Sequence, residues 1–177
     1  ANSKAVIDKL VEGGVDLPFM GCADLQVGLI NARVARMSVT GEKGYEINCR
    51  YGDHITLRRM LLEAGADEGI KEVGFNAMLS TRLEKSFGIW SAEFTQGYTP
   101  AMTAMDRWID FDKANFVGRD AAIAERDGNG PVQVQVTLEV DASDADASGY
   151  EPVWDKGKKV GVVTSGGFGH TLGKSYA

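Results

Sequence analysis

The chain has 177 residues, of which 44% are hydrophobic and 25% charged, a composition typical of a folded globular protein. Its 25 acidic residues outnumber 19 basic residues, so the net charge is −6. We expect neither nucleic acid nor a membrane as a partner, because both bind positive surfaces and no apolar run approaches the ~20 residues of a membrane span. Cys22 and Cys49 lack metal-ligand spacing, which predicts no metal site and a reduced cytoplasmic protein with partly buried thiols.

The first part of the chain mixes helical and strand patterns. Apolar residues recur at helical spacing in some segments and alternate with polar residues in others. Arg82 falls on the same side of its helix as Leu79 and Leu83. The expected elements are a helix over residues 4–12 capped by Ser3, strands over 25–29, 32–39 and 45–50 with a turn at Asn31, a helix capped by Asp53, and a helix over 75–86.

The later part of the chain is expected to be rich in strands. A strand over residues 108–111 and a short helix opened by Gly118 precede the glycine-rich segment 127–131, which is the strongest boundary signal in the chain. Beyond it, apolar and polar residues alternate over 132–140, which predicts a half-buried strand. Further strands are expected over 152–154 and 159–164, with a turn at Gly157. We therefore divide the chain into domains 1–127 and 128–177.

The glycine-rich segment TSGGFGHTLGKS, residues 164–175, invites comparison with a phosphate-binding loop. A P-loop requires Gly-x-x-x-x-Gly-Lys-Ser/Thr, and the glycine upstream of Gly173 is not at that spacing. A dinucleotide loop would have to lead into a helix, which the residues after Gly169 do not provide. The pattern favours a tight turn between strands.

Glu46 is the most informative polar residue in the chain. It lies between Tyr45 and Ile47, directly after the turn over 41–44, which is an unusual place for a carboxylate if that face is buried. A carboxylate on a strand can accept two N–H bonds from a planar heterocycle. An acidic residue on an ordinary β-hairpin is the alternative interpretation.

Five stretches together resemble the folate-binding aminomethyltransferase family, in that family's order and spacing. They are TGEKGYEI (40–47), STRLEKSFGIW (80–90), YTP (98–100), DKANFVGRDA (112–121) and VGVVTSGGFGHTLGKSYA (160–177). The family includes the glycine cleavage T-protein and the C-terminal modules of dimethylglycine dehydrogenase, dimethylglycine oxidase and sarcosine dehydrogenase. The form RLEKSFGIW is most similar to the sarcosine and dimethylglycine dehydrogenase branch.

The resemblance implies an α+β fold, with a partial ferredoxin-like α/β folate-binding region followed by a C-terminal β-barrel-like region. The family has a further N-terminal part that contains the aspartate thought to serve the reaction. The chain is therefore expected to be a fragment of a larger enzyme, and its catalytic residue is unknown.

The resemblance also assigns cofactor-binding positions. Glu46 matches the glutamate that binds the pterin, and Phe87 matches an aromatic wall. Two other positions depart from the family, with Val39 in place of a tyrosine and Met78 in place of an arginine. A third departure is Met102, where an acidic residue is common. Tyr45 and Trp90 are expected to pack behind the site.

The implied cofactor is tetrahydrofolate, which receives a one-carbon unit from a small-molecule amine. The chain would be the tetrahydrofolate-binding part of an aminomethyltransferase or of a sarcosine/dimethylglycine dehydrogenase-type enzyme, with FAD only if a flavin domain lies upstream. The alternatives are a non-catalytic structural or channelling module of the same fold, or a folate-dependent O- or S-demethylase.

Overall fold

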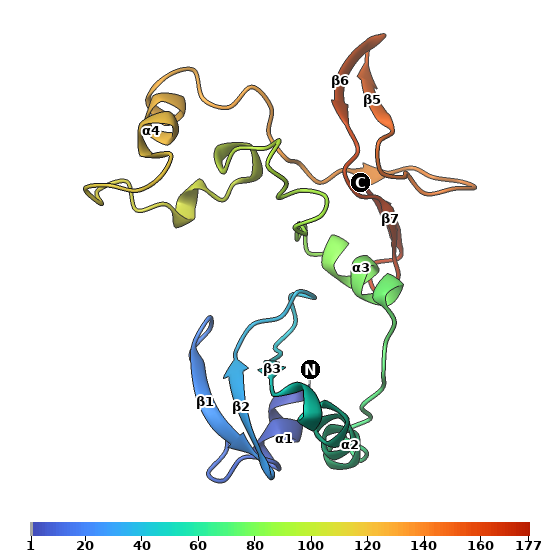
Figure 1. The fold of residues 1–177 in the computed structure, drawn as a ribbon. Coiled ribbons are helices and arrows are strands. Elements are labelled where there is room, and N and C mark those ends of the chain that lie inside the picture. The colour runs from blue at the N-terminus through green and yellow to red at the C-terminus, as the bar shows by residue number, and fades with distance from the viewer. Residues whose placement is uncertain (1) are drawn as a thin grey trace. The chain divides into compact units, whose positions relative to one another are not determined.

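The computed structural model describes residues 2–177 and is shown in Figure 1. The chain divides into two compact units, the first ending at Leu79 and the second running from Ser80 to Ala177. Helix α3, Phe75–Leu83, contains this boundary. Both units combine helices and strands, which confirms the predicted α+β class.

The first unit is built on an antiparallel sheet of three strands in the order β1-β2-β3. Strands β1 (Cys22–Val27) and β2 (Ile30–Ala35) are joined by a two-residue turn, and β3 (Glu46–Asn48) pairs with the far side of β2. Gly28 opens the turn at a φ of +58°, a value that glycine adopts without steric cost. The turn predicted at Asn31 was wrong, because Asn31 lies inside β2 opposite Gln26.

One face of this sheet packs against helices α1 (Ser3–Asp8) and α2 (His54–Ala64), as the lower part of Figure 1 shows. Side chains alternate between the two faces of a strand, so every second residue of β2 enters the core. The opposite face carries the remaining residues of each strand. The buried core cluster consists of Ile7, Val11, Val15, Val27, Ile30, Ala32, Val34 and Leu57.

The helix ends of the first unit follow the sequence signals only in part. Helix α2 ends before Gly65, as predicted, but the Asp53 side chain makes no capping bond. A short 3-10 turn, η1 (Tyr51–Asp53), precedes it. Helix α1 begins at Ser3, whose hydroxyl bonds the carbonyl of Lys43 and so joins the helix to the loop before β3. The predicted cap by Ser3 is therefore wrong.

The second unit begins with the end of α3 and continues through short 3-10 turns to helix α4. These turns are η2 (Ala101–Thr103) and η3 (Asp106–Trp108). The strand predicted over 108–111 does not form, because the Ile109 amide bonds back to Asp106 and no neighbouring strand pairs there. Helix α4 (Arg119–Asp127) follows Gly118, which has a φ of +85° and supplies the predicted start.

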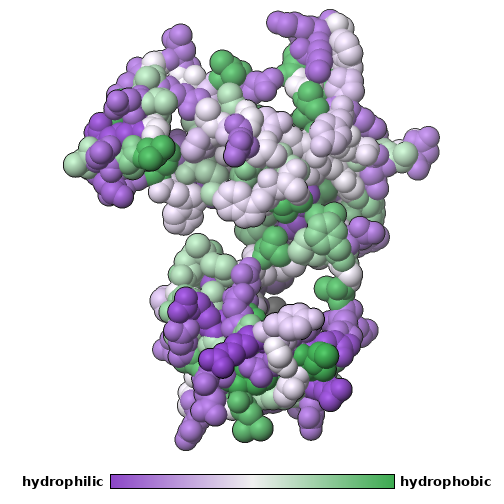
Figure 2. All heavy atoms as spheres, in the orientation of Figure 1, coloured by the Kyte–Doolittle hydropathy of each residue, from purple (hydrophilic) through white to green (hydrophobic). Residues whose placement is uncertain are grey.

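The strands of the second unit form a sheet and a separate hairpin. Strands β4 (Glu139–Val140), β7 (Gly167–Gly169) and β8 (Lys174–Tyr176) pair in the order β4-β8-β7. Strands β5 (Pro152–Asp155) and β6 (Lys158–Val162) form the hairpin, with its predicted turn at Gly157. Figure 2 shows hydrophilic residues gathered at the hairpin tip, where Lys158 lies.

The strand predicted over 132–140 is wrong for most of its length. Only Glu139 and Val140 belong to β4, and Leu138 extends the pairing by exchanging backbone bonds with Ala177. The alternating pattern is present, but a strand also needs a neighbour to bond its backbone. The boundary predicted at 127/128 stays a prediction.

Candidate folate-binding site

Glu46 lies on the face of the first sheet that is turned away from the helices. It is directly opposite Ala35 of β2, whereas Tyr45 and Ile47 pack against the hydrophobic core. Glu46 is exposed, and its carboxylate has no hydrogen-bond or ion-pair partner among residues 2–177. Its position between two apolar residues is thus explained by the alternation of a strand, with the carboxylate on the open face.

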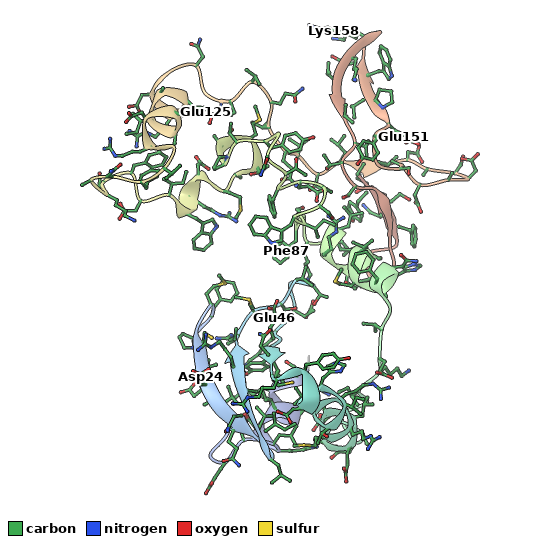
Figure 3. The ribbon with its side chains drawn as sticks, viewed as in Figure 1. Asp24, Glu46, Phe87, Glu125, Glu151 and Lys158 are labelled. Atoms are coloured by element: carbon green, nitrogen blue, oxygen red, sulfur yellow. The ribbon has the colours of Figure 1, made fainter. Side chains whose placement is uncertain are left out.

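The same open face carries a second carboxylate that is fully engaged. Asp24 of β1 is directly opposite Arg33 of β2 and accepts two hydrogen bonds from its guanidinium, each 2.9 Å long. This pairing lowers the pKa of Asp24, chiefly through the hydrogen bonds from Arg33. Figure 3 shows Asp24 on β1 and Glu46 on β3. Cys22 is also exposed, on β1, so the prediction that both thiols are partly buried was wrong for it.

Two further residues assigned by resemblance lie in the first unit. Val39 is exposed in the segment after β2, and Met78 is half-buried on α3. Both are apolar, so neither supplies a hydrogen bond from its side chain to a polar ligand. The structure leaves their assignment as cofactor-binding residues a prediction.

The second unit contains a buried ionic cluster formed by Arg82, Glu93 and Ser165. The side chains of Arg82 and Glu93 are 5% and 2% exposed, and Arg82 Nη1 lies 3.3 Å from Glu93 Oε2. Arg82 Nη2 donates to Ser165 Oγ at 2.7 Å, and this hydroxyl donates in turn to Glu93 Oε1 at 2.5 Å. The cluster joins helix α3 to the nearby turn that contains Glu93 and to Ser165, which is 83 residues away from Arg82 in the sequence.

Glu93 is held in its charged form despite its burial. Burial by itself raises the pKa of Glu93, but hydrogen bonds from Ser165, the Ile89 amide and Thr164, together with the charge of Arg82, outweigh it. The net result is a pKa below the ordinary carboxyl value. The Nε–H of Arg82 is the one buried side-chain polar atom in residues 2–177 without a partner.

Phe87 lies four residues beyond Leu83, the last residue of α3, and directly follows Ser86, which has a left-handed φ of +59°. The residue is 43% exposed, and Figure 3 labels it close to α3. Trp90 is 81% exposed and meets Phe94 edge to face, with 5.7 Å between ring centres. The expectation that Trp90 packs behind a site was therefore wrong, whereas Tyr45 does pack against the core.

The glycine-rich segment serves close packing. A Cβ on Gly166 would lie 2.1 Å from the carbonyl oxygen of Ala147, which no side chain can tolerate without backbone movement. A Cβ on Gly169 would meet Glu84 and Tyr176 at 2.8 and 2.9 Å. The segment crosses from β6 to the β7–β8 hairpin, which agrees with the predicted turn between strands.

A cavity of about 480 Å³ opens in the second unit. Its walls are mainly valines of residues 132–136 and of the β5–β6 hairpin, and its polar lining includes Glu93, Tyr98 and Thr164. The carboxylate of Glu93 is already satisfied by the cluster described above, and Thr103, Gln133 and Gln135 add further polar groups to a lining that is mostly apolar. Among residues 2–177 no helix could cross a membrane, and no group of three or more His, Cys, Asp or Glu side chains could hold a metal.

Comparison with known proteins defines the class of the chain. The family model described as the GCVT N-terminal domain matches residues 1–113, and the model of the glycine cleavage T-protein C-terminal barrel domain matches residues 133–177. The chain therefore belongs to the glycine cleavage T-protein family. The two matches stand in the order expected from the motifs, and residues 114–132 lie between them.

Individual relatives agree with this classification. The chain is 34% identical to mitochondrial dimethylglycine dehydrogenase of Rattus norvegicus, over 90% of this chain and 19% of that protein. It is 35% identical to an aminomethyltransferase of Bacillus cereus, over 86% of this chain and 41% of that protein. The crystal structure of glycine cleavage system aminomethyltransferase T from Bartonella henselae matches with a TM-score of 0.84 and 28% identity, covering 97% of this chain and 46% of that one. The chain thus spans less than half of each of these relatives.

The sequence did not reveal the buried cluster. Arg82 was placed on the apolar side of its helix, and a charged residue in that position signals a buried partner. The partner could not be named, because Ser165 lies 83 residues away in the chain.

Proposed function

We propose that the chain is the tetrahydrofolate-binding part of a one-carbon (aminomethyl) transferase or of a sarcosine/dimethylglycine dehydrogenase-type enzyme. The observation that carries the proposal is the ordered match of both family models, with an unpaired carboxylate, Glu46, in the first of them. The relatives include dimethylglycine dehydrogenase and an aminomethyltransferase, which supports both enzyme types named in this proposal.

The free carboxylate of Glu46 is chemically complementary to the N–H edge of a pterin ring. Both oxygens of Glu46 are available, since Arg33, the cation on the same face, is engaged by Asp24. A carboxylate that accepts two N–H bonds from one edge of a planar heterocycle fixes the ring's orientation. Phe87, in the second unit, is a partly exposed aromatic residue that the resemblance assigns to the cofactor. In this proposal the residues of the chain bind and orient the cofactor. The bound cofactor supplies the secondary amine that accepts a one-carbon unit from a small-molecule amine.

A calorimetric titration of the whole chain with tetrahydrofolate tests this proposal. In Glu46→Gln one acceptor oxygen becomes an amide donor, so we expect the dissociation constant to rise about 10- to 100-fold. Glu63→Gln, on the exposed side of α2, is the matched control and should bind like the wild type. Equal affinity of Glu46→Gln and the wild type would contradict the role of Glu46, and absence of binding to the wild-type chain would contradict the proposal.

A non-catalytic module is the second candidate. It is favoured by Val39 and Met78, which are apolar where the resemblance implies a tyrosine and an arginine. If these departures weaken folate binding, Met78→Arg should tighten it while Met78→Leu should not. Tight binding by the wild type, unchanged in Met78→Arg, would count against this candidate.

A further inference from the structure

We propose that Arg82 is a positioning residue, whose side chain fixes the backbone of Phe87 and thereby the direction of the Phe87 ring. The resemblance assigns this ring to the cofactor as an aromatic wall, so the ligand part of this inference rests on the proposed function. The geometric part rests only on contacts within the second unit.

The first step is that both backbone polar groups of Phe87 are bound by one residue. The Phe87 amide donates to the carbonyl of Arg82 at 3.1 Å, and the Ser86 amide donates to the carbonyl of Leu83 at 3.0 Å. These two bonds, with Ser86 in the left-handed region, form the Schellman end of a helix. The carbonyl of Phe87 then accepts a hydrogen bond of 2.9 Å from Arg82 Nη1.

The second step is that the guanidinium is itself held. Nη1 also contacts Glu93, and Nη2 donates to Ser165, so the plane of the group is fixed from two sides. Glu93 in turn accepts the amide of Ile89 at 2.9 Å, two residues beyond Phe87. The segment between Phe87 and Glu93 is therefore bound to the Arg82 cluster at each end.

The third step is that this segment has no room to adjust. A Cβ on Gly88 would lie 2.7 Å from the ring of Phe94 and 2.8 Å from Glu93. The backbone on the C-terminal side of Phe87 is thus fixed by packing, as the backbone on its N-terminal side is fixed by the helix end. Phe87 itself lies at the surface, where 43% of the residue is exposed.

The fourth step concerns why the residue that holds Phe87 is an arginine. Burying two charges costs desolvation energy, and apolar replacements of such pairs are often as stable or more stable. The burial of Arg82 and Glu93 is therefore weak evidence that the pair serves only to stabilise the fold. The planar guanidinium can donate to Phe87, Glu93 and Ser165 in fixed directions, whereas a lysine ammonium on a flexible stem cannot reproduce that geometry.

Fluorine NMR of the full chain labelled with para-fluorophenylalanine tests the positioning role without any ligand. The chain has seven phenylalanines, and Phe87→Leu identifies the Phe87 resonance as the one that disappears. In Arg82→Lys we expect this resonance to broaden and move, while the resonances of Phe19 and Phe75 in the first unit keep their positions. The control is Val163→Ala, which removes part of a buried side chain of the same unit and should leave the Phe87 resonance unchanged.

An unchanged Phe87 resonance in folded Arg82→Lys would overturn the proposal. If Arg82→Lys does not fold, Ser165→Ala takes its place, because it removes the acceptor of Nη2 and loosens the guanidinium. Broadening of the Phe87 resonance in Ser165→Ala supports the proposal, and a sharp, unshifted resonance overturns it.

A tetrahydrofolate titration of the same variants separates this inference from the proposed function. We expect Arg82→Lys to raise the dissociation constant about five- to tenfold, with Val163→Ala close to wild type. If the wild-type chain does not bind tetrahydrofolate, the proposed function fails, and the fluorine resonance still decides whether Arg82 positions Phe87.

Discussion

Arg82 binds both backbone polar groups of Phe87, accepting the amide at its own carbonyl and donating from its guanidinium to the Phe87 carbonyl. Arg82, in the last turn of helix α3, therefore also fixes the chain segment that follows the helix. Because the guanidinium is shared with Glu93 and with the distant Ser165, the position of Phe87 depends in part on a segment 83 residues away from Arg82.

Stability should depend on pH through Glu93. Its pKa in the folded chain lies below the ordinary value of 4.5, so folding favours the deprotonated carboxylate. This contribution is fully present above the unfolded-state pKa and is lost as the pH falls through the folded-state pKa. We expect Glu93→Gln to lower the free energy of unfolding by about 3 kcal/mol near neutral pH, and the difference from wild type to shrink below about pH 4.5.

Urea unfolding at about pH 6 and at about pH 3.5 measures this difference. Glu63→Gln, which changes an exposed carboxylate, provides the control for the general effect of losing one charge. A deficit of Glu93→Gln that stays constant over this range would show that the charge of Glu93 does not contribute.

Gly166 should be among the least replaceable residues of the second unit. Gly166→Ala places a methyl group 2.1 Å from the Ala147 carbonyl oxygen. Because the backbone fixes the position of a Cβ and the carbonyl is itself a backbone group, no rotamer change can relieve the strain. We expect a loss of about 3 kcal/mol in the free energy of unfolding. Gly97→Ala is the control, since its nearest atom lies at 3.7 Å and the expected change is within about 0.5 kcal/mol.

Phe87 should contribute to folate binding through its aromatic face. Phe87→Leu keeps an apolar side chain but removes stacking worth about 0.5–1.5 kcal/mol, so the dissociation constant for tetrahydrofolate should rise roughly 3- to 10-fold. Phe168→Leu is the matched control, because Phe168 is 38% exposed in the same unit and was not assigned to the site. Equal effects of both substitutions in a calorimetric titration would remove Phe87 from the proposed site.

Backbone amides of residues 132–137 should exchange rapidly with solvent. In this segment only the Gln135 amide has a backbone partner, the carbonyl of Met102, whereas the amides of β2 lie in the central strand of a sheet. Hydrogen exchange followed by mass spectrometry should therefore show early deuteration of 132–137 and late deuteration of 30–35. Strong protection of 132–137 in the isolated chain would show that a strand does form there.

Several features of the fold follow from local sequence. The alternation in Ile30–Ala35 fixes which side chains face the core, and Gly65 ends α2 where glycine signals a helix terminus. The motif TGEKGYEI was sufficient to place Glu46 after a turn and on a strand, and the family was identified from its five motifs. These signals are local, because they depend on residues within one turn or one strand of each other.

Other features were decided only by tertiary structure. The pattern of residues 132–140 is that of a strand, yet only its last two residues pair, because a strand is completed by backbone groups of another segment. The same holds for the carboxylate of Glu46, whose exposure depends on which face of the sheet the helices cover. One partner of Arg82, Ser165, likewise comes from a distant segment of the chain. Sequence thus determined the elements and the family, whereas long-range hydrogen bonding and packing decided which polar groups are buried together.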